Sequence, residues 1–184
     1  LLIGGGGNDV IRGGFGADTM DGGEGRDTIS YQGSTNWVSV SLSAGVAYGA
    51  EGAGDTLTGF ENIRGSEVGD ALYGDDGNNR IEGGGGGDYI SGGAGRDVLV
   101  GGDGDDVFLM TKDSGVDTIL DFLPGGGWED RIQIDMDGAF ADFDSIMAVA
   151  TQVGDDTVID FSGGNILILA GVDRSALTAQ DFVI

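Results

Sequence analysis

Cysteine and histidine are both absent from the 184-residue sequence, and basic residues are scarce, with eight lysine and arginine residues against 32 aspartate and glutamate residues. The lack of cysteine excludes disulfide bonds and thiol nucleophiles. The lack of histidine excludes a Ser-His-Asp triad and a histidine-ligated zinc site. The few basic residues are scattered and leave no footprint of nucleic-acid binding. We therefore expect a non-catalytic chain without a nucleic-acid partner, and any enzymatic centre would belong to a larger parent protein.

Long apolar runs are missing as well. The longest, such as Ile166–Ala170, extend over five residues, whereas a membrane-spanning helix needs about 20. No membrane span is therefore expected. The sequence starts without methionine, and Leu2 falls on the apolar eighth position of a repeat unit whose glycines are not present. This start predicts that the chain is a piece of a longer polypeptide with an upstream domain.

The most informative feature that is present is a nine-residue repeat. Gly4–Ser30 consists of three tandem copies of the pattern G-G-x-G-x-D-x-U-x, in which U is apolar. Five further units begin at Gly65, Gly74, Gly83, Gly92 and Gly101. The unit at Gly65 departs from the pattern at Ser66 and Val68, and the unit at Gly74 departs at Asp75 and Asn79. Eight matches at a fixed period predict a repeat architecture.

Each part of the pattern has a physical meaning. The glycines allow tight turns with positive φ and leave backbone carbonyls free to converge. The carboxylate at position 6 joins those carbonyls, and a set of hard, anionic oxygen ligands suits calcium. The last three positions form a short strand whose middle side chain points inward. The predicted inward row is Ile11, Met20, Ile29, Leu72, Ile81, Ile90, Leu99 and Phe108.

Two units give one coil, so the turn of each unit should lie beside the turn of the unit that begins 18 residues later. This stacking pairs Asp9 with Asp27, Asp70 with Asp88, Asp88 with Asp106, and Asn79 with Asp97. Stacked carboxylates repel one another unless a divalent cation lies between them. A flexible Gly/Asp-rich linker is the alternative, but it does not account for the periodic apolar position.

These residues resemble the RTX (repeats-in-toxin) calcium-binding proteins. The resemblance implies an all-β fold, a parallel β-roll with calcium ions held between successive turns. It also implies which groups are the ligands, namely the carbonyls at positions 2 and 4 and the side chain at position 6. The implied ligands are Gly5, Gly7, Asp9, Gly14, Gly16, Asp18, Gly23, Gly25, Asp27, Asp70, Asn79, Gly84, Gly86, Asp88, Gly93, Gly95, Asp97, Gly102, Gly104 and Asp106. Asn79 departs from the pattern, so its site is expected to be weaker.

A segment without the repeat, residues 31–64, separates the two repeat blocks. The alternation in Trp37–Leu42 predicts a half-buried strand, and Val46–Tyr48 could return as a hairpin. Residues 55–57 look like a repeat tail. The stretch that follows resembles a loop of secreted RTX metalloproteases, which implies that Glu61 and the carbonyl of Gly59 bind calcium; the alternative for Glu61 is a solvated side chain.

From residue 110 onward the glycine repeat gives way to longer strands. Thr118–Phe122, Arg131–Asp135, Thr157–Phe161 and Asn165–Ala170 read as strands, and Phe143–Thr151 reads as a helix capped by Asp142. The resemblance implies that residues 1–109 form the roll and that residues 110–184 cap it with a small β-sandwich. Asp117 is a further candidate calcium ligand or, equally, a surface residue. The last residues, Leu177–Ile184, resemble the uncleaved signal that type I secretion systems recognise.

Two functions remain open. The first is a secreted module that folds on binding calcium after export and stabilises a larger protein. The second is calcium-dependent polysaccharide binding, as in mannuronan epimerases; the net charge of −24 and the lack of an evident row of basic or aromatic side chains weigh against it. Adhesion to ice or another surface would need a flat array of side chains, and position 3 of the repeat is too irregular to supply one.

Overall fold

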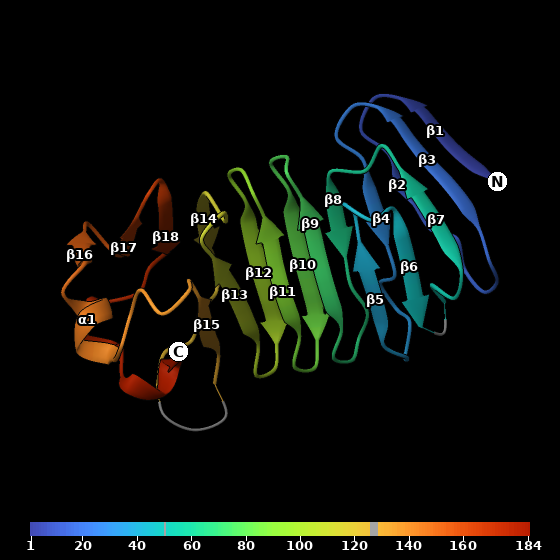
Figure 1. The fold of residues 1–184 in the computed structure, drawn as a ribbon. Helices are drawn as coiled ribbons and strands as arrows, with labels where there is room; N and C mark the ends of the chain where they lie inside the picture. Colours follow the sequence, from blue (N-terminus) through green and yellow to red (C-terminus); the bar gives the residue numbers. More distant parts are fainter. Residues whose placement is uncertain (50, 126–128) are drawn as a thin grey trace.

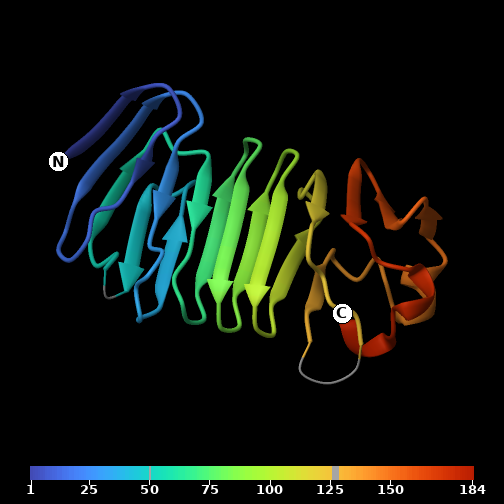
Figure 2. The same cartoon turned by 180° about the vertical axis from the view of Figure 1, so that it is seen from behind.

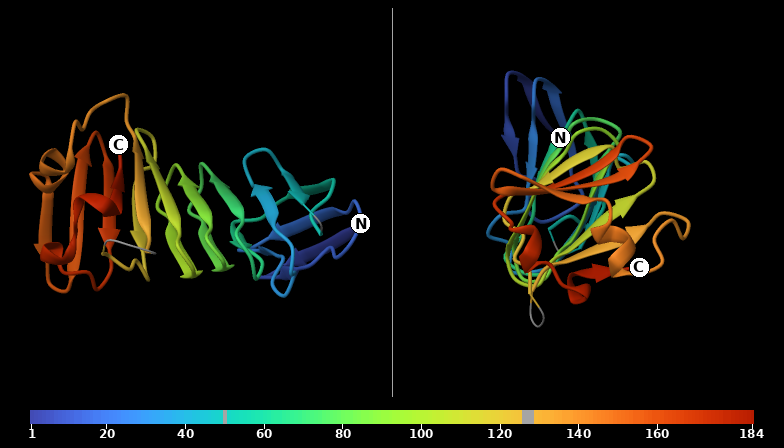
Figure 3. Two further views of the ribbon diagram at one scale, coloured as in Figure 1. Left: turned by 90° about the horizontal axis from the view of Figure 1, so that it is seen from below. Right: turned by 90° about the vertical axis from the view of Figure 1, so that its left-hand side faces the viewer.

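The computed structural model describes residues 1–49, 51–125 and 129–184, and it is built almost entirely of β-strands in two facing sheets (Figures 1 and 3). Sheet A contains, in spatial order, β1 (Leu2–Gly6), β3 (Thr19–Glu24), β7 (Asp55–Thr58), β6 (Val46–Gly49), β5 (Val38–Ser41), β9 (Ala71–Asp75), β11 (Tyr89–Gly93), β13 (Val107–Thr111), β15 (Arg131–Asp135) and β19 (Phe182–Val183). Sheet B contains β16 (Ala150–Val153), β17 (Asp156–Ser162), β18 (Asn165–Leu169), β14 (Val116–Ile119), β12 (Val98–Asp103), β10 (Arg80–Gly85), β8 (Asn62–Arg64), β4 (Thr28–Ser30) and β2 (Val10–Ile11).

Successive repeat units place their strands alternately in the two sheets, which confirms the predicted coil. In sheet B, Ile81 of β10 pairs with Leu99 of β12, and in sheet A, Leu72 of β9 pairs with Ile90 of β11. Both pairs are parallel and join residues that lie two repeat units apart. The coils follow one another along the axis of the roll, with the N-terminus at one end and the C-terminal segment at the other (Figures 1 and 2).

The core lies between the two sheets and consists of the apolar middle residues of the strands. All eight side chains of the predicted inward row are buried. Complete burial of one such side chain stabilises the fold by about 1.5–3 kcal/mol. Most repeat strands contribute one buried apolar side chain to this core, whereas β5 and β13 contribute two each.

The segment without the repeat is built into the roll. Strands β5 and β6 form the predicted antiparallel hairpin, and β7 then pairs in parallel with β3, with Leu57 beside Met20. Strand β5 continues the sheet in parallel with β9. The buried Tyr31 hydroxyl donates a hydrogen bond to Asp55 Oδ2 at 3.0 Å. Sheet A is therefore continuous across the gap between the two repeat blocks.

The C-terminal segment extends both sheets. Strand β14 pairs in parallel with β18, which joins β17 and β16 in an antiparallel arrangement, and β15 pairs with β19. The prediction of strands at residues 131–135, 157–161 and 165–170 is confirmed, whereas the strand expected at 118–122 lies slightly earlier, in β14. A separate capping sandwich and the division at residue 109 stay predictions.

The helix expected over residues 143–151 ends early, because only the first five residues of that range are helical. Helix α1 spans Phe143–Met147, and Asp142 caps it as predicted by accepting a hydrogen bond from the Ser145 backbone N–H. Strand β16 begins at Ala150 because Thr151 and Val153, both β-branched, pair with β17. Short 3₁₀ turns at Arg174–Ala176 and Ala179–Asp181 precede β19. Across the described ranges, no helix has the length and apolar character needed to cross a membrane.

Candidate metal-binding turns

The position-6 side chains form two ladders along the roll, one at the start of the strands of each sheet. In both ladders, carboxylate oxygens accept hydrogen bonds from backbone N–H groups of the neighbouring coil. In the sheet B ladder, Asp27 Oδ1 accepts from Asp9 and Asp97 Oδ1 accepts from Asn79, at 2.7 and 2.8 Å. In the sheet A ladder, Asp88 accepts from Asp70 and Asp106 accepts from Asp88, at 2.7 and 2.8 Å. All four predicted stacking pairs are confirmed as neighbours.

Five of these carboxylates have a second oxygen that is buried and accepts no hydrogen bond from the described residues. The five atoms are the Oδ2 atoms of Asp9, Asp27, Asp88, Asp97 and Asp106. A buried charged oxygen without a partner is strongly unfavourable. We call these five positions the open rungs.

Each open rung faces the glycine at position 1 of its own unit. A Cβ atom added to Gly83, Gly92 or Gly101 would collide with Oδ2 of Asp88, Asp97 or Asp106, respectively. A Cβ atom at Gly83 would also lie 2.5 Å from the carbonyl oxygen of Gly101 in the next coil. The glycine thus leaves room in which a carboxylate oxygen and a backbone carbonyl converge. The prediction of positive φ for all the glycines of the pattern is wrong for position 1, since Gly83, Gly92 and Gly101 do not have it, and the role of this position is instead to leave space.

The glycines at positions 2 and 4 shape the turn. In the unit at Gly83, for example, Gly84 has a φ of 115° and Gly86 a φ of 85°, a region that other residues rarely enter. In the inner coils a Cβ at these positions would meet backbone of the preceding coil, as Gly102 would meet the Gly84 carbonyl. Gly5, Gly7, Gly14 and Gly16 belong to the outermost units, and a Cβ there would meet nothing within 4 Å.

The residues at the open rungs fit calcium. The donor set is carboxylate and carbonyl oxygen, which is what Ca²⁺ prefers. No group of three acidic, histidine or cysteine side chains comes together among the described residues. Most ligands would therefore have to be backbone carbonyls, as the glycine turns supply. A divalent cation at each rung would also neutralise the buried charge.

The electrostatics show how unfavourable the turns are without a cation. Burial raises the pKa of Asp88 to about 8; the hydrogen bond from the Asp70 backbone opposes this rise, and the charges of Asp106 and Asp70 add to it. Burial likewise raises the pKa of Asp97 and of Asp106 to about 6. Asp88 therefore resists ionisation at neutral pH when nothing cationic is beside it, and Asp97 and Asp106 ionise less readily than free carboxyl groups.

Asp70 and Asn79, in the two degenerate units, differ from the open rungs because protein groups satisfy both of their side-chain polar atoms. Asp70 Oδ2 accepts from the Ser66 N–H at 2.6 Å, and Oδ1 accepts from the Ser66 hydroxyl and the Val38 N–H. Asn79 Oδ1 accepts from the Asp75 N–H, and its Nδ2 donates to the Glu61 carbonyl at 3.0 Å and to Asp75 Oδ1 at 3.1 Å. We call these two positions the closed rungs. They carry no unpaired oxygen for a metal ion.

Two candidates outside the repeats lie in the sheet B ladder. Glu61 Oε2 accepts from the Asp27 N–H at 2.8 Å, and the Gly59 carbonyl lies where a Cβ on Gly22 would be. Asp117 is buried and accepts from the Asp97 N–H at 3.1 Å, so it is not a surface residue. Burial, followed by the charge of Asp97, raises the pKa of Asp117 to about 8. Glu61 is held in the ladder and is not freely solvated.

Two further ladder members were missed. Asp55 accepts from the half-buried Asp18 N–H at 2.9 Å, and Asp130 accepts from the Asp106 N–H at 3.0 Å. Both have their second oxygen satisfied, by Tyr31 and by the Leu123 N–H. Asp55 begins β7 and Asp130 lies directly before β15, and both fit the D-x-U pattern of the repeat tail, which residues 55–57 were expected to form without a ladder role for Asp55.

Comparisons with known proteins address the same residues. The family model described as the RTX calcium-binding nonapeptide repeat, in four copies, matches residues 1–29 and 73–108. No curated protein matches the chain.

Two solved structures are among those similar to the chain. The extracellular lipase LipA from Serratia marcescens is 20% identical, with a TM-score of 0.45; the match covers 100% of this chain and 38% of the lipase. The AlgE6R3 subunit of the mannuronan C5-epimerase from Azotobacter vinelandii is 26% identical, with a TM-score of 0.35, over 64% of this chain and 78% of that subunit. The present chain thus spans well under half the length of the lipase.

The repeat pattern, the register of the coils and the matching family model agree on the nature of the two repeat blocks. They are RTX calcium-binding nonapeptide repeats, folded as a parallel β-roll.

Proposed function

We propose that calcium binds at the five open rungs and that this binding drives the chain to fold. The observation that carries the proposal is the set of five buried Oδ2 atoms without a hydrogen-bond partner among the described residues, each beside a glycine turn. The closed rungs at Asp70 and Asn79 are not assigned a calcium ion. Glu61, Gly59 and Asp117 contribute to the rungs beside them, at Asp27 and Asp97.

Calcium would supply much of the net stability. The formal charge of −24 opposes a compact state in the absence of counter-ions. Extracellular calcium modules bind with Kd on the order of 10⁻⁴–10⁻³ M. A site occupied at about ten times its Kd adds about 1.4 kcal/mol, so several sites reach the ~5–15 kcal/mol of a typical domain. The chain would remain unfolded at cytosolic calcium and fold after export.

The same proposal includes export by a type I secretion system, a non-catalytic role and attachment to an upstream domain. Support for export comes from Leu177–Ile184, where Asp181 and Phe182 are followed by two further apolar residues. In the folded chain both Asp181 and Phe182 are buried. An exporter would therefore meet this segment before folding. Deleting residues 177–184 should abolish export of the chain by a type I system, and continued export would refute the assignment.

The calcium assignment is tested by thermal melting of Asp97→Ala. Loss of one site should lower the melting temperature in about 10 mM calcium by about 3–6 °C. Asp103→Ala is the matched control because it removes the same charge from an exposed position in the same coil. Equal melting temperatures for the two variants would exclude Asp97 as a ligand.

A further inference from the structure

An outward aliphatic surface occupies the C-terminal half of sheet B. Strands β12, β14, β18 and β17 lie side by side there, and their pairing aligns Val98, Thr118 and Ile168 in one outward row. The neighbouring rows are apolar as well, because the outward positions of a strand alternate with the buried ones. We call the seven outward aliphatic side chains of this region the aliphatic face: Val98, Val100, Val116, Leu120, Val158, Ile166 and Ile168.

The core does not use the aliphatic face. None of the seven side chains is among the buried hydrophobic residues. Six of them are half-buried between their strand neighbours, and Leu120 is 44% exposed. Helix α1, which contacts β17, lies on the opposite side of the sheet, where its Ile146 joins the core. Contiguous apolar surface of this kind typically marks an interaction site.

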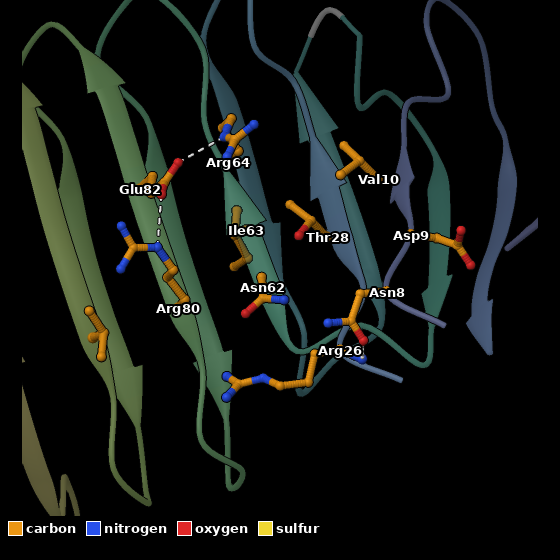
Figure 4. Close-up of a pocket in the computed structure, with 11 residues that line it drawn as sticks. Asn8, Asp9, Val10, Arg26, Thr28, Asn62, Ile63, Arg64, Arg80 and Glu82 are labelled. Carbon is orange, nitrogen blue, oxygen red and sulfur yellow. Dashed lines mark hydrogen bonds and ion pairs between the residues drawn. The ribbon is translucent and has the colours of Figure 1, made fainter. Parts of the chain in front are cut away.

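One border of the aliphatic face is basic. Arg80 of β10 lies beside Val98 of β12. Figure 4 shows Arg80 and Arg64 on either side of Glu82, whose two carboxylate oxygens accept hydrogen bonds from the Nε atoms of the arginines, both at 2.8 Å. Two positive charges thus meet one negative charge on β8 and β10.

The opposite border is acidic. It is formed by β17, on which Val158 lies between the outward residues Asp156 and Asp160. Neither aspartate forms an ion pair with a residue in the described ranges. The aliphatic face therefore has a positive border on one side and a negative border on the other.

The order of the strands makes this surface complementary to itself. Strand β14 lies in the middle, with β12 and β10 on one side and β18 and β17 on the other. A two-fold axis parallel to β14, between two copies that face each other, would lay β12 over β18 and β10 over β17. Aliphatic side chains would then meet aliphatic side chains. In the same arrangement Arg80 would lie opposite Val158, between Asp156 and Asp160 of the second copy. A two-fold interface requires such self-complementarity.

Other classes of partner fit this surface less well. A basic protein would be attracted to the carboxylates that give the chain its net charge of −24, whereas the aliphatic face itself is uncharged. An anionic membrane surface would repel the same carboxylates. Two sheet faces, in contrast, pack in nearly aligned orientation about 10 Å apart, with interdigitating side chains. A second copy of the chain supplies such a face together with the complementary borders.

The size of the surface determines the expected affinity. The strands from β10 to β17 extend over about 20 Å at the usual spacing. A patch of this width is smaller than the ~800 Å² per partner of a standard stable interface and belongs with weak, transient contacts. The surface therefore predicts a dimer that forms at micromolar concentrations and dissociates on dilution.

We propose that the aliphatic face joins two copies of this chain in a two-fold dimer, in which Arg80 of each copy pairs with Asp156 and Asp160 of the other. The dimer rests on the proposed calcium function, because only the folded roll places β12, β14 and β18 side by side. It is nevertheless a separate property, since the aliphatic face lies on the strands and the calcium ladders lie at the turns.

The test is sedimentation velocity of the calcium-loaded chain at concentrations from about 1 to 200 μM, a range that brackets a micromolar dissociation constant. The wild type should shift from monomer toward dimer over this range. Ile168→Asp places a charge within the aliphatic face and should keep the chain monomeric throughout. Val107→Asp is the matched control, because Val107 is a half-buried outward residue on a central strand of sheet A. Its dimerisation should equal that of the wild type.

A charge exchange tests the two borders independently. Arg80→Asp would face two aspartates of the second copy and should weaken dimerisation about tenfold or more. Asp160→Arg should weaken it as well, because the new arginine would face Arg80. The combined variant Arg80→Asp/Asp160→Arg should recover the affinity to within about threefold of the wild type. A merely structural role of either residue would not produce this recovery.

Far-UV circular dichroism in calcium separates loss of folding from loss of association. If Ile168→Asp fails to fold, the charge exchange decides. A wild type that is folded but monomeric at about 200 μM would overturn the dimer alone, as would equal loss of dimer in Val107→Asp or no recovery in the combined variant. A wild type that stays unfolded in calcium would contradict the calcium function itself. Binding of a folded monomer to neutral phosphatidylcholine vesicles, abolished by Ile168→Asp, would overturn the choice of a second copy over a membrane.

Discussion

At the scale of single residues, a few atoms distinguish a rung that needs a cation from a rung that does not. Asp97 and Asn79 are neighbours in the same ladder, and the Asn79 N–H donates to Asp97. Asp97 keeps a buried oxygen without a partner among the described residues, whereas Asn79 uses its amide nitrogen as a donor to Glu61 and Asp75. The hydrogen bonds of the Asn79 amide therefore take the place of the metal ion that we assign to Asp97.

Asn79→Asp should convert a closed rung into an open one. The new carboxylate cannot donate to the Glu61 carbonyl or to Asp75, so the variant should be less stable than the wild type in chelator by about 1–3 kcal/mol. Calcium should restore that loss. Urea unfolding with and without calcium measures both effects, and a variant whose stability in chelator equals that of the wild type would contradict the account of the closed rungs.

The raised pKa values predict an unusual response of the calcium-free chain to pH. A carboxyl group whose pKa is higher in the folded state than in the unfolded state favours folding fully below its unfolded pKa, near 4. That contribution is lost as pH rises through about 6 for Asp97 and Asp106, and through about 8 for Asp88. In the presence of chelator, the content of β-structure should therefore increase as the pH is lowered from 8 to 4.5. Circular dichroism at constant ionic strength checks this, and a decrease toward pH 4.5 would contradict it.

At the scale of elements, the glycine turns connect the two sheets and also leave space for the ladder. Gly83→Ala would place a methyl group against Asp88 Oδ2 and the Gly101 carbonyl. We expect a loss of about 1–3 kcal/mol in the calcium form, together with weaker calcium binding. Gly6→Ala is the control because a Cβ there would meet no atom within 4 Å. Urea unfolding in calcium gives both values, and equal stability of the two variants would exclude a packed turn at Gly83.

Much of the element arrangement could be predicted, because the period alone determines it. Leu72 and Ile90 occupy the same position of units that lie one coil apart, and their strands pair in the register that this spacing predicts. The open rungs at Asp88, Asp97 and Asp106 follow from the same pattern. The shortened helix α1 could not be read from periodicity, since the pairing of Thr151 with β17 is a tertiary interaction.

Other features depend on how the segment without the repeat joins the roll. Arg64 belongs to that segment and Arg80 to a degenerate unit, so their alignment beside Glu82 arises only when β8 is placed between β4 and β10. The Ser66 hydrogen bonds that close the rung at Asp70 likewise depend on the exact turn that replaces the usual glycine. Pattern matching marks such positions as irregular but does not give their chemistry.

At the scale of the whole molecule, charge and architecture act together. A chain with a net charge of −24 stacks its carboxylates in two ladders along one roll. Folding must bring these charges together, and in the absence of a cation it must also bury five unpaired oxygens. Calcium would remove both penalties at once, and because neighbouring coils share their turns, binding at one rung should favour binding at the next.

The most direct test is a calcium titration, from zero to about 10 mM, followed by far-UV circular dichroism, with magnesium as the control. Mg²⁺ requires a smaller, nearly octahedral site and should not substitute at these turns. The account predicts a cooperative transition from an unfolded to a β-rich spectrum that calcium produces and magnesium does not. A β-rich spectrum that is the same in chelator and in calcium would contradict it, because the roll would then be stable with its carboxylates unpaired.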